Sequence, residues 1–354
     1  MNGSATSPRI LVPGHPAIAE GDCQVVAEAG ANHNNDVQTA IDMAVSAAQA
    51  GAWAIKFQLY KAESLTVPDS PKYWQDSIGT RSQFEAFKLS DHLDYDQWGP
   101  VADACRDLGI VFFATPFDLD AVEALENLGV PIYKLASADI THKPLIEAIA
   151  ETGKPLMMST GASSIDEIAR AVDWSGLGPD RLVILACTLT YPTPDPDGHF
   201  ARITTLRRQF EPYLIGSSDH TVGPEGGWIA SALGAVLIEK HFTITPDAGE
   251  VPDHTMSVTQ DQLAVLVEAA HRGAILRGRE SVELIPSELP ARQLARRSIV
   301  SSRPIAMGET IVESSIDFRR PGTGIAPYEV DAVVGRKAAI DIPPNSTMEW
   351  DWIE

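Results

Sequence analysis

The sequence contains little cysteine, and its cysteines lie far apart. There are three, Cys23, Cys105 and Cys187. An odd number of widely spaced cysteines argues against a disulfide framework and against a cysteine-based zinc site. We therefore expect reduced, buried thiols in a cytoplasmic protein.

Basic residues are also scarce. Lys and Arg number 27 against 48 Asp and Glu, which gives a formal net charge of −21. A chain this acidic is poorly suited to nucleic acid or to an anionic membrane as its main partner. An anionic substrate would need a few individually placed Lys or Arg side chains.

Long apolar runs are missing as well. No run approaches the ~20 residues of a membrane span, so we expect no membrane insertion. Residues 1–16 lack the basic start and apolar centre of a secretory signal, and they are predicted to form a loose tail.

From residue 23 onward, short apolar runs alternate with helical patterns. The runs are nearly continuous, as expected for strands covered on both faces. Eight strands are predicted, at 24–29, 52–58, 110–115, 131–137, 155–160, 181–188, 213–217 and 235–241, and helices are predicted at 37–50, 94–108, 119–128, 145–151, 165–172, 224–233 and 260–276. This repeat predicts an α/β fold, a (β/α)₈ TIM barrel. A doubly wound open sheet is the main alternative. No GxGxxG motif follows the first strand, which argues against a dinucleotide site.

The predicted domains are a barrel at 17–284, a linker at 285–290 and a small β-rich domain at 291–354. Short β-like runs in the last domain, at 298–300, 310–312 and 338–342, are separated by turn residues.

Within the barrel, a long polar excursion at 59–90 follows the second strand. Such excursions often build pockets or lids, although a surface insertion packed by its own aromatics explains this one equally well.

Two histidines mark the ends of the last two strands. His220 follows an apolar run within Ser218-Asp219-His220-Thr221, and His241 closes the next run within Glu239-Lys240-His241. Because neighbouring parallel strands end at the same edge of a sheet, both imidazoles should lie close enough to share a divalent metal. Two imidazoles would leave open positions for substrate oxygens, which suits Mn²⁺, Fe²⁺, Co²⁺ or Zn²⁺ better than Mg²⁺.

Two lysines lie inside apolar strands, and a buried ammonium needs an anionic partner. Lys56 and Lys134 could each form a structural salt bridge, with Glu28 as the obvious partner. Hydroxyl groups of Thr115, Ser137, Ser159 and Ser218 are predicted at the same barrel mouth. Together these donors favour a site for a phosphate and a carboxylate.

These stretches together resemble the sialic acid synthase family. The similarity runs from about residue 17 to the end of the chain. Its motifs are Ala27–Asn34, Ile55–Gln58, Tyr133–Asp139, Ser159-Thr160-Gly161, Cys187-Thr188 with Tyr191-Pro192-Thr193, Ser218–Thr221, Glu239–Thr243 and Pro252-Asp253-His254. The last domain is similar to the family's SAF (antifreeze-like) domain, most clearly at Arg320–Gly324.

The resemblance implies condensation of phosphoenolpyruvate with an N-acylated aldohexose, such as N-acetylmannosamine, to give a nonulosonic 2-keto acid and phosphate. It implies that His220 and His241 hold the metal, Mn²⁺ first with Mg²⁺ or Co²⁺ as alternatives. Glu28 would activate or orient the attacking water. Phosphoenolpyruvate would be bound by Lys56, Thr115, Lys134, Ser137, Ser159 and Ser218, and the sugar or the metal's waters by Gln58, Asp139, Tyr191 and Asp253.

The family also forms a homodimer in which the SAF domain of one subunit caps the barrel of the other. Arg320 would then contact the sugar's N-acyl group in the partner's site; otherwise it is a turn residue in a surface ion pair. Leu189 stands where the family's sialic acid synthases carry an asparagine that touches phosphoenolpyruvate. Ala136, Ala138 and Asp139 also depart from the common motif.

These departures leave the sugar open, and a legionaminic-type, pseudaminic-type or specialised-metabolite precursor is compatible with the sequence. Two other functions remain open too. A Schiff-base aldolase would use Lys134 as its nucleophile. A barrel that had lost activity, as Leu189 would suggest, would leave the SAF-like domain as a binding module.

Overall fold

The computed structural model describes residues 8–74, 79–246 and 252–354. The chain divides into two compact units, Met1–Gly278 and Arg279–Glu354, and each is described here by itself. No helix in these ranges is both long and apolar enough to cross a membrane.

The first unit is built on a parallel sheet of eight strands within the described ranges. They are β3 (Gln24–Gly30), β4 (Ala54–Leu59), β5 (Val111–Pro116), β6 (Tyr133–Leu135), β7 (Leu156–Ser159), β8 (Leu182–Cys187), β9 (Leu214–Asp219) and β10 (Leu237–His241), in the spatial order β5-β4-β3-β10-β9-β8-β7-β6. The first and last strands in sequence, β3 and β10, are paired. β5 and β6 lie next to each other without a continuous ladder. The predicted barrel is therefore confirmed, and the open doubly wound alternative is wrong.

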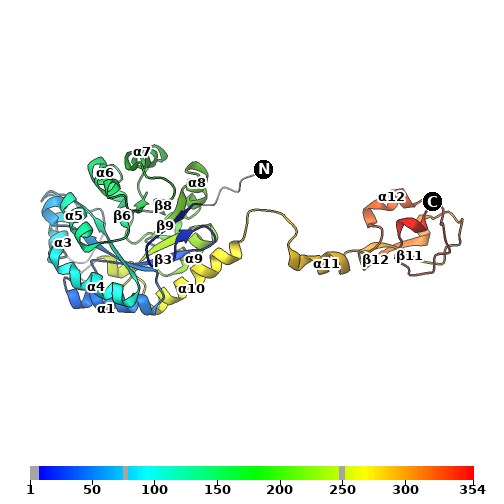
Figure 1. The fold of residues 1–354 in the computed structure, drawn as a ribbon, viewed down its shortest axis with the longest axis horizontal. Helices are drawn as coiled ribbons and strands as arrows, with labels where there is room; N and C mark the ends of the chain where they lie inside the picture. The colour runs from blue at the N-terminus through cyan, green and yellow to red at the C-terminus, as the bar shows by residue number, and fades with distance from the viewer. Residues whose placement is uncertain (1–7, 75–78, 247–251) are drawn as a thin grey trace. The chain divides into compact units, whose positions relative to one another are not determined.

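Helices surround these strands (Figure 1). The main ones are α1 (Val37–Gln49), α4 (Gly99–Leu108), α5 (Leu119–Leu128), α6 (Lys143–Glu151), α7 (Ile165–Ser175), α8 (Arg202–Gln209), α9 (Glu225–Ala232) and α10 (Gln260–Arg277). Strand and helix side chains form one large apolar core, which explains why the strands read as continuous apolar runs. Asp118 caps α5 by accepting from the Ala121 amide at 2.7 Å.

Helix α8 has no counterpart among the predicted helices. Its sequence is mostly polar, and only Ile203 and Leu206 are buried. Two apolar residues three positions apart are a weak periodic signal. The helix forms because this pair packs into the barrel core.

The predicted loose tail is wrong from residue 9 onward. β1 (Arg9–Ile10) pairs with β2 (Ile18–Ala19) as an antiparallel ladder. Ile10 and Ile18 are fully buried and belong to the barrel core. Burial of these two side chains stabilises a segment that carries no regular pattern in the sequence.

The excursion after β4 contains two short helices, α2 (Ala62–Leu65) and α3 (Gln83–Lys88). The helix predicted at 94–108 begins with a single 3₁₀ turn, η1 (Tyr95–Trp98), and continues as α4. The described part of the excursion is therefore folded, and it follows the carboxyl end of β4.

The second unit has its own small core, which includes Ile299, Ile305, Ile311 and Ile342. β11 (Ser298–Ser301) pairs antiparallel with β12 (Ile316–Arg319). The predicted runs at 310–312 and 338–342 form isolated bridges, Thr310 with Lys337 and Ala338 with Ile353, and not full strands. Short helices complete the unit: η5 (Pro286–Glu288) and α11 (Leu289–Leu294), which occupy the predicted linker, and η6 (Glu313–Ser315), η7 (Pro327–Glu329), α12 (Val330–Val333) and η8 (Trp350–Trp352).

Candidate active site

Polar side chains meet at the carboxyl ends of the barrel strands. Parallel pairing aligns Glu28 with Lys56 and Ser218 with Glu239. Because side chains alternate along a strand, Glu239 and His241 point to the same face. Buried polar residues at these ends are Glu28, Lys56, Thr115, Lys134, Ser137, Ser159, Ser218, His220, Glu239 and His241. The structure thus places at the strand ends the residues that the sequence located there, Glu239 included.

Lys56 is held between two carboxylates and a hydroxyl. Its Nζ lies 2.8 Å from Glu28 Oε2 and 3.8 Å from Glu239 Oε2, and it donates to Thr115 Oγ1 at 2.8 Å. Burial opposes the charged form, but Glu239 and Glu28 outweigh it and raise the pKa of Lys56. The salt bridge to Glu28 that the sequence suggested is therefore present, and it keeps the ammonium charged.

Lys134 is paired more loosely. Its Nζ lies 3.7 Å from Glu239 Oε1 and donates to the Leu135 carbonyl at 3.1 Å. Burial lowers the pKa of Lys134, and Glu239 only partly opposes this shift. A buried ammonium with one distant carboxylate is underpaired, so Lys134 is available to an additional anion.

Glu239 connects the two lysines; sequence reasoning placed it at the strand end beside His241 but did not assign it as their partner. It accepts from Ser218 Oγ at 3.0 Å, and attraction to Lys134 and Lys56 overcomes burial and lowers its pKa. The signal was present, because Glu239 precedes the inward-facing His241 by two strand positions.

Glu28 differs from Glu239 in its protonation. Burial raises the pKa of Glu28 to about 7, despite the opposing charge of Lys56. Gln58 donates to Glu28 Oε1 at 2.8 Å and fixes the carboxyl. A carboxyl that titrates near neutral pH can accept or release a proton during a reaction.

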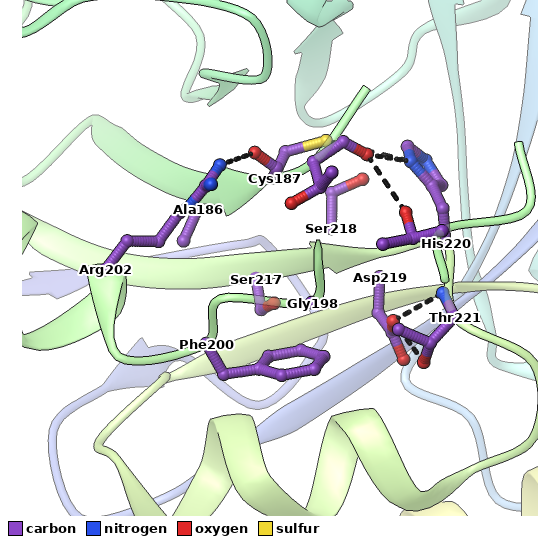
Figure 2. A pocket seen from close by; sticks show the side chains of 12 residues that line it. Ala186, Cys187, Gly198, Phe200, Arg202, Ser217, Ser218, Asp219, His220 and Thr221 are labelled. Carbon is purple, nitrogen blue, oxygen red and sulfur yellow. Dashed lines mark hydrogen bonds between the residues drawn. The ribbon is translucent and has the colours of Figure 1, made fainter. Parts of the chain in front are cut away.

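The two predicted metal-binding histidines lie side by side at the mouth. Their ring centroids are 5.4 Å apart, which confirms the prediction that they share one edge of the sheet. With metal–nitrogen bonds of about 2.1 Å, two rings at this spacing can reach one ion. Figure 2 shows His220 on the same side of β9 as Ser218 and opposite Asp219.

Each imidazole has a nitrogen suited to a ligand. His220 Nδ1 donates to the Thr188 carbonyl at 2.8 Å, so Nε2 is the nitrogen left for a metal. Burial opposes the charged ring, but Cys187 outweighs it and raises the pKa of His220; Nε2 therefore offers its lone pair once the ring has lost a proton. His241 Nδ1 is buried without a hydrogen bond, 3.5 Å from Asp253 Oδ2. Burial, with the charge of His220 next, lowers the pKa of His241 well below its usual value, so its ring is neutral.

The donor set fits a metal held by two imidazoles with open positions. Among the residues the structure describes, no group of three or more His, Cys, Asp or Glu side chains is arranged to hold a metal ion. A closed structural site is therefore absent from those residues. The remaining ligands of a catalytic metal would be water and substrate oxygens.

Other predicted site residues surround this centre. The side chains of Ser159 and Asp139 each have a buried oxygen without a hydrogen-bond partner. An unpaired buried oxygen costs roughly 1–3 kcal/mol, so these atoms favour a ligand or water as partner. Burial raises the pKa of Asp139, and likewise that of Asp253, to about 6.

Tyr191 lies against both imidazoles. Its ring centroid is 4.3 Å from that of His220 and 6.1 Å from that of His241. On the excursion, the ring of Tyr73 lies 6.4 Å from that of Tyr191. The excursion therefore reaches the mouth, as the pocket-or-lid interpretation requires.

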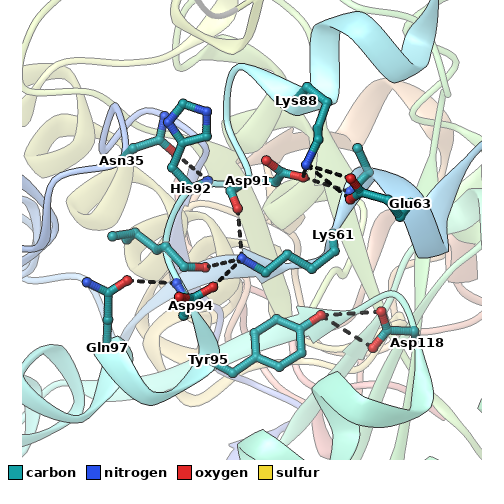
Figure 3. Close-up of polar contacts among 12 residues, drawn as sticks. Asn35, Lys61, Glu63, Lys88, Asp91, His92, Asp94, Tyr95, Gln97 and Asp118 are labelled. Carbon is teal, nitrogen blue, oxygen red and sulfur yellow. Dashed lines mark hydrogen bonds and ion pairs between the residues drawn. The ribbon is translucent and has the colours of Figure 1, made fainter. Parts of the chain in front are cut away.

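The excursion is tied to the barrel by Lys61 (Figure 3). Its Nζ donates to the carbonyls of Asp91 and Leu93 and to Asp94 Oδ1, at 2.9, 3.1 and 2.8 Å. Lys88 adds an ion pair to Glu63 at 2.8 Å. One ammonium with three oxygen partners fixes the base of the excursion, leaving its tip near Tyr191.

Leu189 and Ser137 flank Gly161. A Cβ at Gly161 would lie 2.9 Å from Ser137 Oγ and 3.0 Å from Leu189 Cβ, so only glycine fits there. Ser137 Oγ accepts from the Gly161 amide at 2.8 Å. Leu189 thus places an apolar side chain beside a predicted anion-binding hydroxyl.

Gly30 has a similar role between the acid residues. Its φ is +52°, and a Cβ there would lie 2.6 Å from Asp253 Oδ2. Glycine lets Asp253 approach Glu28 and Gln58.

Arg320 is the remaining predicted site residue. It belongs to the second unit, where its side chain is exposed.

Comparison with known proteins identifies the family. Residues 30–281 match the NeuB family and residues 296–354 the SAF domain. The chain is 33% identical over 340 residues to N,N'-diacetyllegionaminic acid synthase of Legionella pneumophila, covering 94% of this chain and 95% of that protein. It is 30% identical to pseudaminic acid synthase of Helicobacter pylori over 336 residues, covering 94% and 98%.

A solved structure agrees with these relatives. The N-acetylneuraminic acid synthetase of Leptospira borgpetersenii, determined with citrate, is 31% identical and covers 81% of this chain and 96% of its own, with a TM-score of 0.72. The chain belongs to the NeuB family and is an enzyme, with a C-terminal SAF domain.

Proposed function

We propose that this enzyme condenses phosphoenolpyruvate with an N-acylated aldohexose to give a nonulosonic 2-keto acid and phosphate. The observation that carries the proposal is the meeting, at one barrel mouth, of two buried lysines with two adjacent imidazoles. Relatives named as legionaminic and pseudaminic acid synthases support it.

Phosphoenolpyruvate would bind to the ammonium and hydroxyl groups of the mouth. Lys134 is underpaired, and Lys56 and Lys134 both lie beyond hydrogen-bond distance of Glu239, at 3.8 and 3.7 Å. A phosphate and a carboxylate can therefore approach these ammonium groups while Ser218 still donates to Glu239. The hydroxyls of Thr115, Ser137, Ser159 and Ser218 would complete the site.

His220 and His241 are the residues that would hold a divalent metal, Mn²⁺ first with Mg²⁺ or Co²⁺ as alternatives. When bound, such a metal supplies polarisation of the sugar aldehyde. The protein's own contribution is orientation. Thr188 fixes the ring of His220, and Tyr191 packs over both imidazoles.

In the reaction, C3 of phosphoenolpyruvate bonds to the aldehyde carbon, and the aldehyde oxygen takes up a proton to become a hydroxyl. Water adds at C2, and the bond between C2 and the bridging oxygen breaks as phosphate leaves. Glu28 is placed to take the proton of that water, because its pKa is about 7 and Gln58 holds its carboxyl. Lys56 and Lys134 balance the charge of the donor throughout. Gln58, Asp139, Tyr191 and Asp253 would contact the sugar or the metal's waters.

The acceptor would be N-acetylmannosamine or a related amino sugar of the legionaminic or pseudaminic type. In a homodimer, the SAF domain would be exchanged so that Arg320 reaches the partner's mouth and contacts the N-acyl group. The three free, buried cysteines fit the cytoplasm as the compartment of the reaction.

Phosphate release from phosphoenolpyruvate, measured against a panel of N-acylated aldoses, tests the proposal. We expect release with at least one amino sugar and its loss in EDTA, restored by Mn²⁺. The proposal would be refuted if phosphate were released at the same rate whether or not an aldose is present. It would also be refuted if no phosphate were released with any of the metals.

A second function is favoured by one observation. Burial lowers the pKa of Lys134, which makes its neutral amine more available as a Schiff-base nucleophile. An aldolase of this kind would be trapped by borohydride as a substrate adduct on Lys134. The synthase predicts no adduct.

A further inference from the structure

Behind the two histidines lies a buried ion pair that the reaction does not use. Lys240 Nζ lies 2.9 Å from Asp219 Oδ2, and both side chains are completely buried. The two residues are direct neighbours on β10 and β9. Asp219 points away from the mouth, on the opposite side of its strand from Ser218 and His220 (Figure 2).

The same pair closes the turn that carries His220. Asp219 Oδ1 accepts from the Thr221 amide at 2.9 Å and from Thr221 Oγ1 at 2.8 Å. Lys240 donates to the Thr221 carbonyl. The residues on both sides of His220 are thus bound to Lys240, whose chain neighbour is His241.

Helix α9 seals this arrangement. A Cβ at Gly226 would lie 2.6 Å from Asp219 Oδ2 and 2.6 Å from Thr221 Oγ1. Any larger residue would displace the carboxylate or the hydroxyl. Every polar side-chain atom of the pair has a protein partner, unlike several buried atoms at the mouth.

We propose that Asp219 and Lys240 are positioning residues that set the spacing of His220 and His241 for a shared divalent metal. The inference rests on the proposed function, because it concerns the metal proposed there. One ammonium fixes the backbone beside both imidazoles. Outer groups that orient metal ligands typically change metal affinity 10–100-fold when they are lost.

The test measures Mn²⁺ binding to the full-length protein after chelator treatment, using the electron paramagnetic resonance signal of unbound Mn²⁺. Urea unfolding of the same variants measures their stability in parallel. Lys240→Met alone would leave a buried carboxylate unpaired and destabilise the fold. The double variant Asp219→Asn/Lys240→Met removes both charges, a change that is often neutral for stability.

A control removes a partly exposed ion pair elsewhere in the barrel. Glu126→Gln/Lys154→Met breaks the contact between the end of α5 and the residue two positions before β7, at the other end of the strands. We expect the control to bind Mn²⁺ as the wild type does, and the Asp219/Lys240 variant to bind at least about tenfold more weakly at similar stability.

Unchanged affinity in a folded Asp219/Lys240 variant would overturn the inference while leaving the proposed metal site intact. Should the double variant not fold, Asp219→Asn/Lys240→Gln, which removes both charges but keeps polar side chains able to hydrogen-bond to each other, decides the question by the same criterion. Failure of the wild type to bind Mn²⁺ would instead refute the metal role in the proposed function, and this inference with it.

Discussion

The two faces of the β9–β10 strand pair are built on different principles. On the outer face, Asp219, Lys240 and Thr221 form a closed set in which each charge has a partner within hydrogen-bond distance. On the inner face, Glu239 is shared between two lysines at more than 3.5 Å, and His241 Nδ1 has no hydrogen bond. The same residue types thus form a rigid ion pair on the outer face. On the inner face they leave charged and polar groups that can bind a ligand.

This difference suggests a way to separate supporting from reacting groups. A closed ion pair resists change and fixes the backbone, whereas loosely paired charges accept a ligand at little cost. Substitutions on the inner face should therefore reduce activity more than stability. Substitutions on the outer face should reduce metal binding by changing the spacing of His220 and His241.

Among the groups proposed to bind the substrates, the largest effect is expected from Lys56→Met. Removing the ammonium leaves Glu28 and Glu239 as neighbouring buried carboxylates and removes a donor for the substrate anion. Loss of one partner of a buried charge pair costs about 2–5 kcal/mol, so we expect kcat/KM to fall by roughly 10³-fold. Steady-state phosphate release measures it; a change below tenfold would show that Lys56 is structural.

Glu28→Gln should reduce kcat by roughly 10²-fold and remove a pH dependence. In the wild type, the raised pKa of about 7 predicts that kcat/KM rises with pH through that value as Glu28 loses its proton. The variant should lack this limb. A pH–rate profile that keeps its shape in the variant would assign the limb to another group.

The same shift has a consequence for stability, with a defined sign. The folded pKa of Glu28 is raised from 4.5 to about 7, so its contribution is fully present below pH 4.5 and is lost as pH rises to about 7. A shift of this size corresponds to roughly 3 kcal/mol. Urea unfolding of metal-free protein should show a smaller decline over this range in Glu28→Gln than in the wild type.

Arg320→Ala tests whether the second unit contributes to the mouth. If Arg320 contacts the sugar, its loss should raise KM for the aldose roughly tenfold, because a hydrogen bond from a charged group contributes about that factor to binding. KM for phosphoenolpyruvate should change little. Lys337→Ala, also in the second unit, is the control. Equal kinetics for both variants would make Arg320 a surface residue.

The smallest effect is expected from Leu189→Asn. Leu189 packs beside Gly161 and Ser137, where an amide could donate to the phosphoenolpyruvate anion. One added hydrogen bond is worth about 1 kcal/mol, so KM for phosphoenolpyruvate should fall by roughly fivefold. Leu189→Ala controls for loss of bulk, and a higher KM in the asparagine variant would contradict this interpretation.

Much of the barrel was predictable because burial on both faces leaves a continuous apolar signature in each strand. Helix α8 was missed since only Ile203 and Leu206 are buried. Ile10 and Ile18 pair β1 with β2 through packing that no local pattern announces. The expected runs at 310–312 and 338–342 form single bridges, because strand propensity does not specify a ladder partner.

The candidate site was predictable as a set of residues but not as a network. The histidines and lysines could be placed at one mouth from strand ends alone. That Lys240 binds Asp219 depends on the register between β9 and β10. That Glu239 pairs with both lysines depends on closure of the barrel, which brings β4 and β6 toward β10. Roles that depend on the second unit, such as that of Arg320, lie beyond what either sequence pattern or barrel geometry fixes.

The most direct test is a Mn²⁺ titration of chelated enzyme, with phosphate release from phosphoenolpyruvate and the accepted aldose as readout. We predict that turnover rises with occupancy of one site per chain in the wild type and is absent in His220→Ala at the same Mn²⁺ concentration. Full turnover in EDTA, or an unchanged titration in His220→Ala, would contradict the central claim that two imidazoles hold the metal needed for condensation.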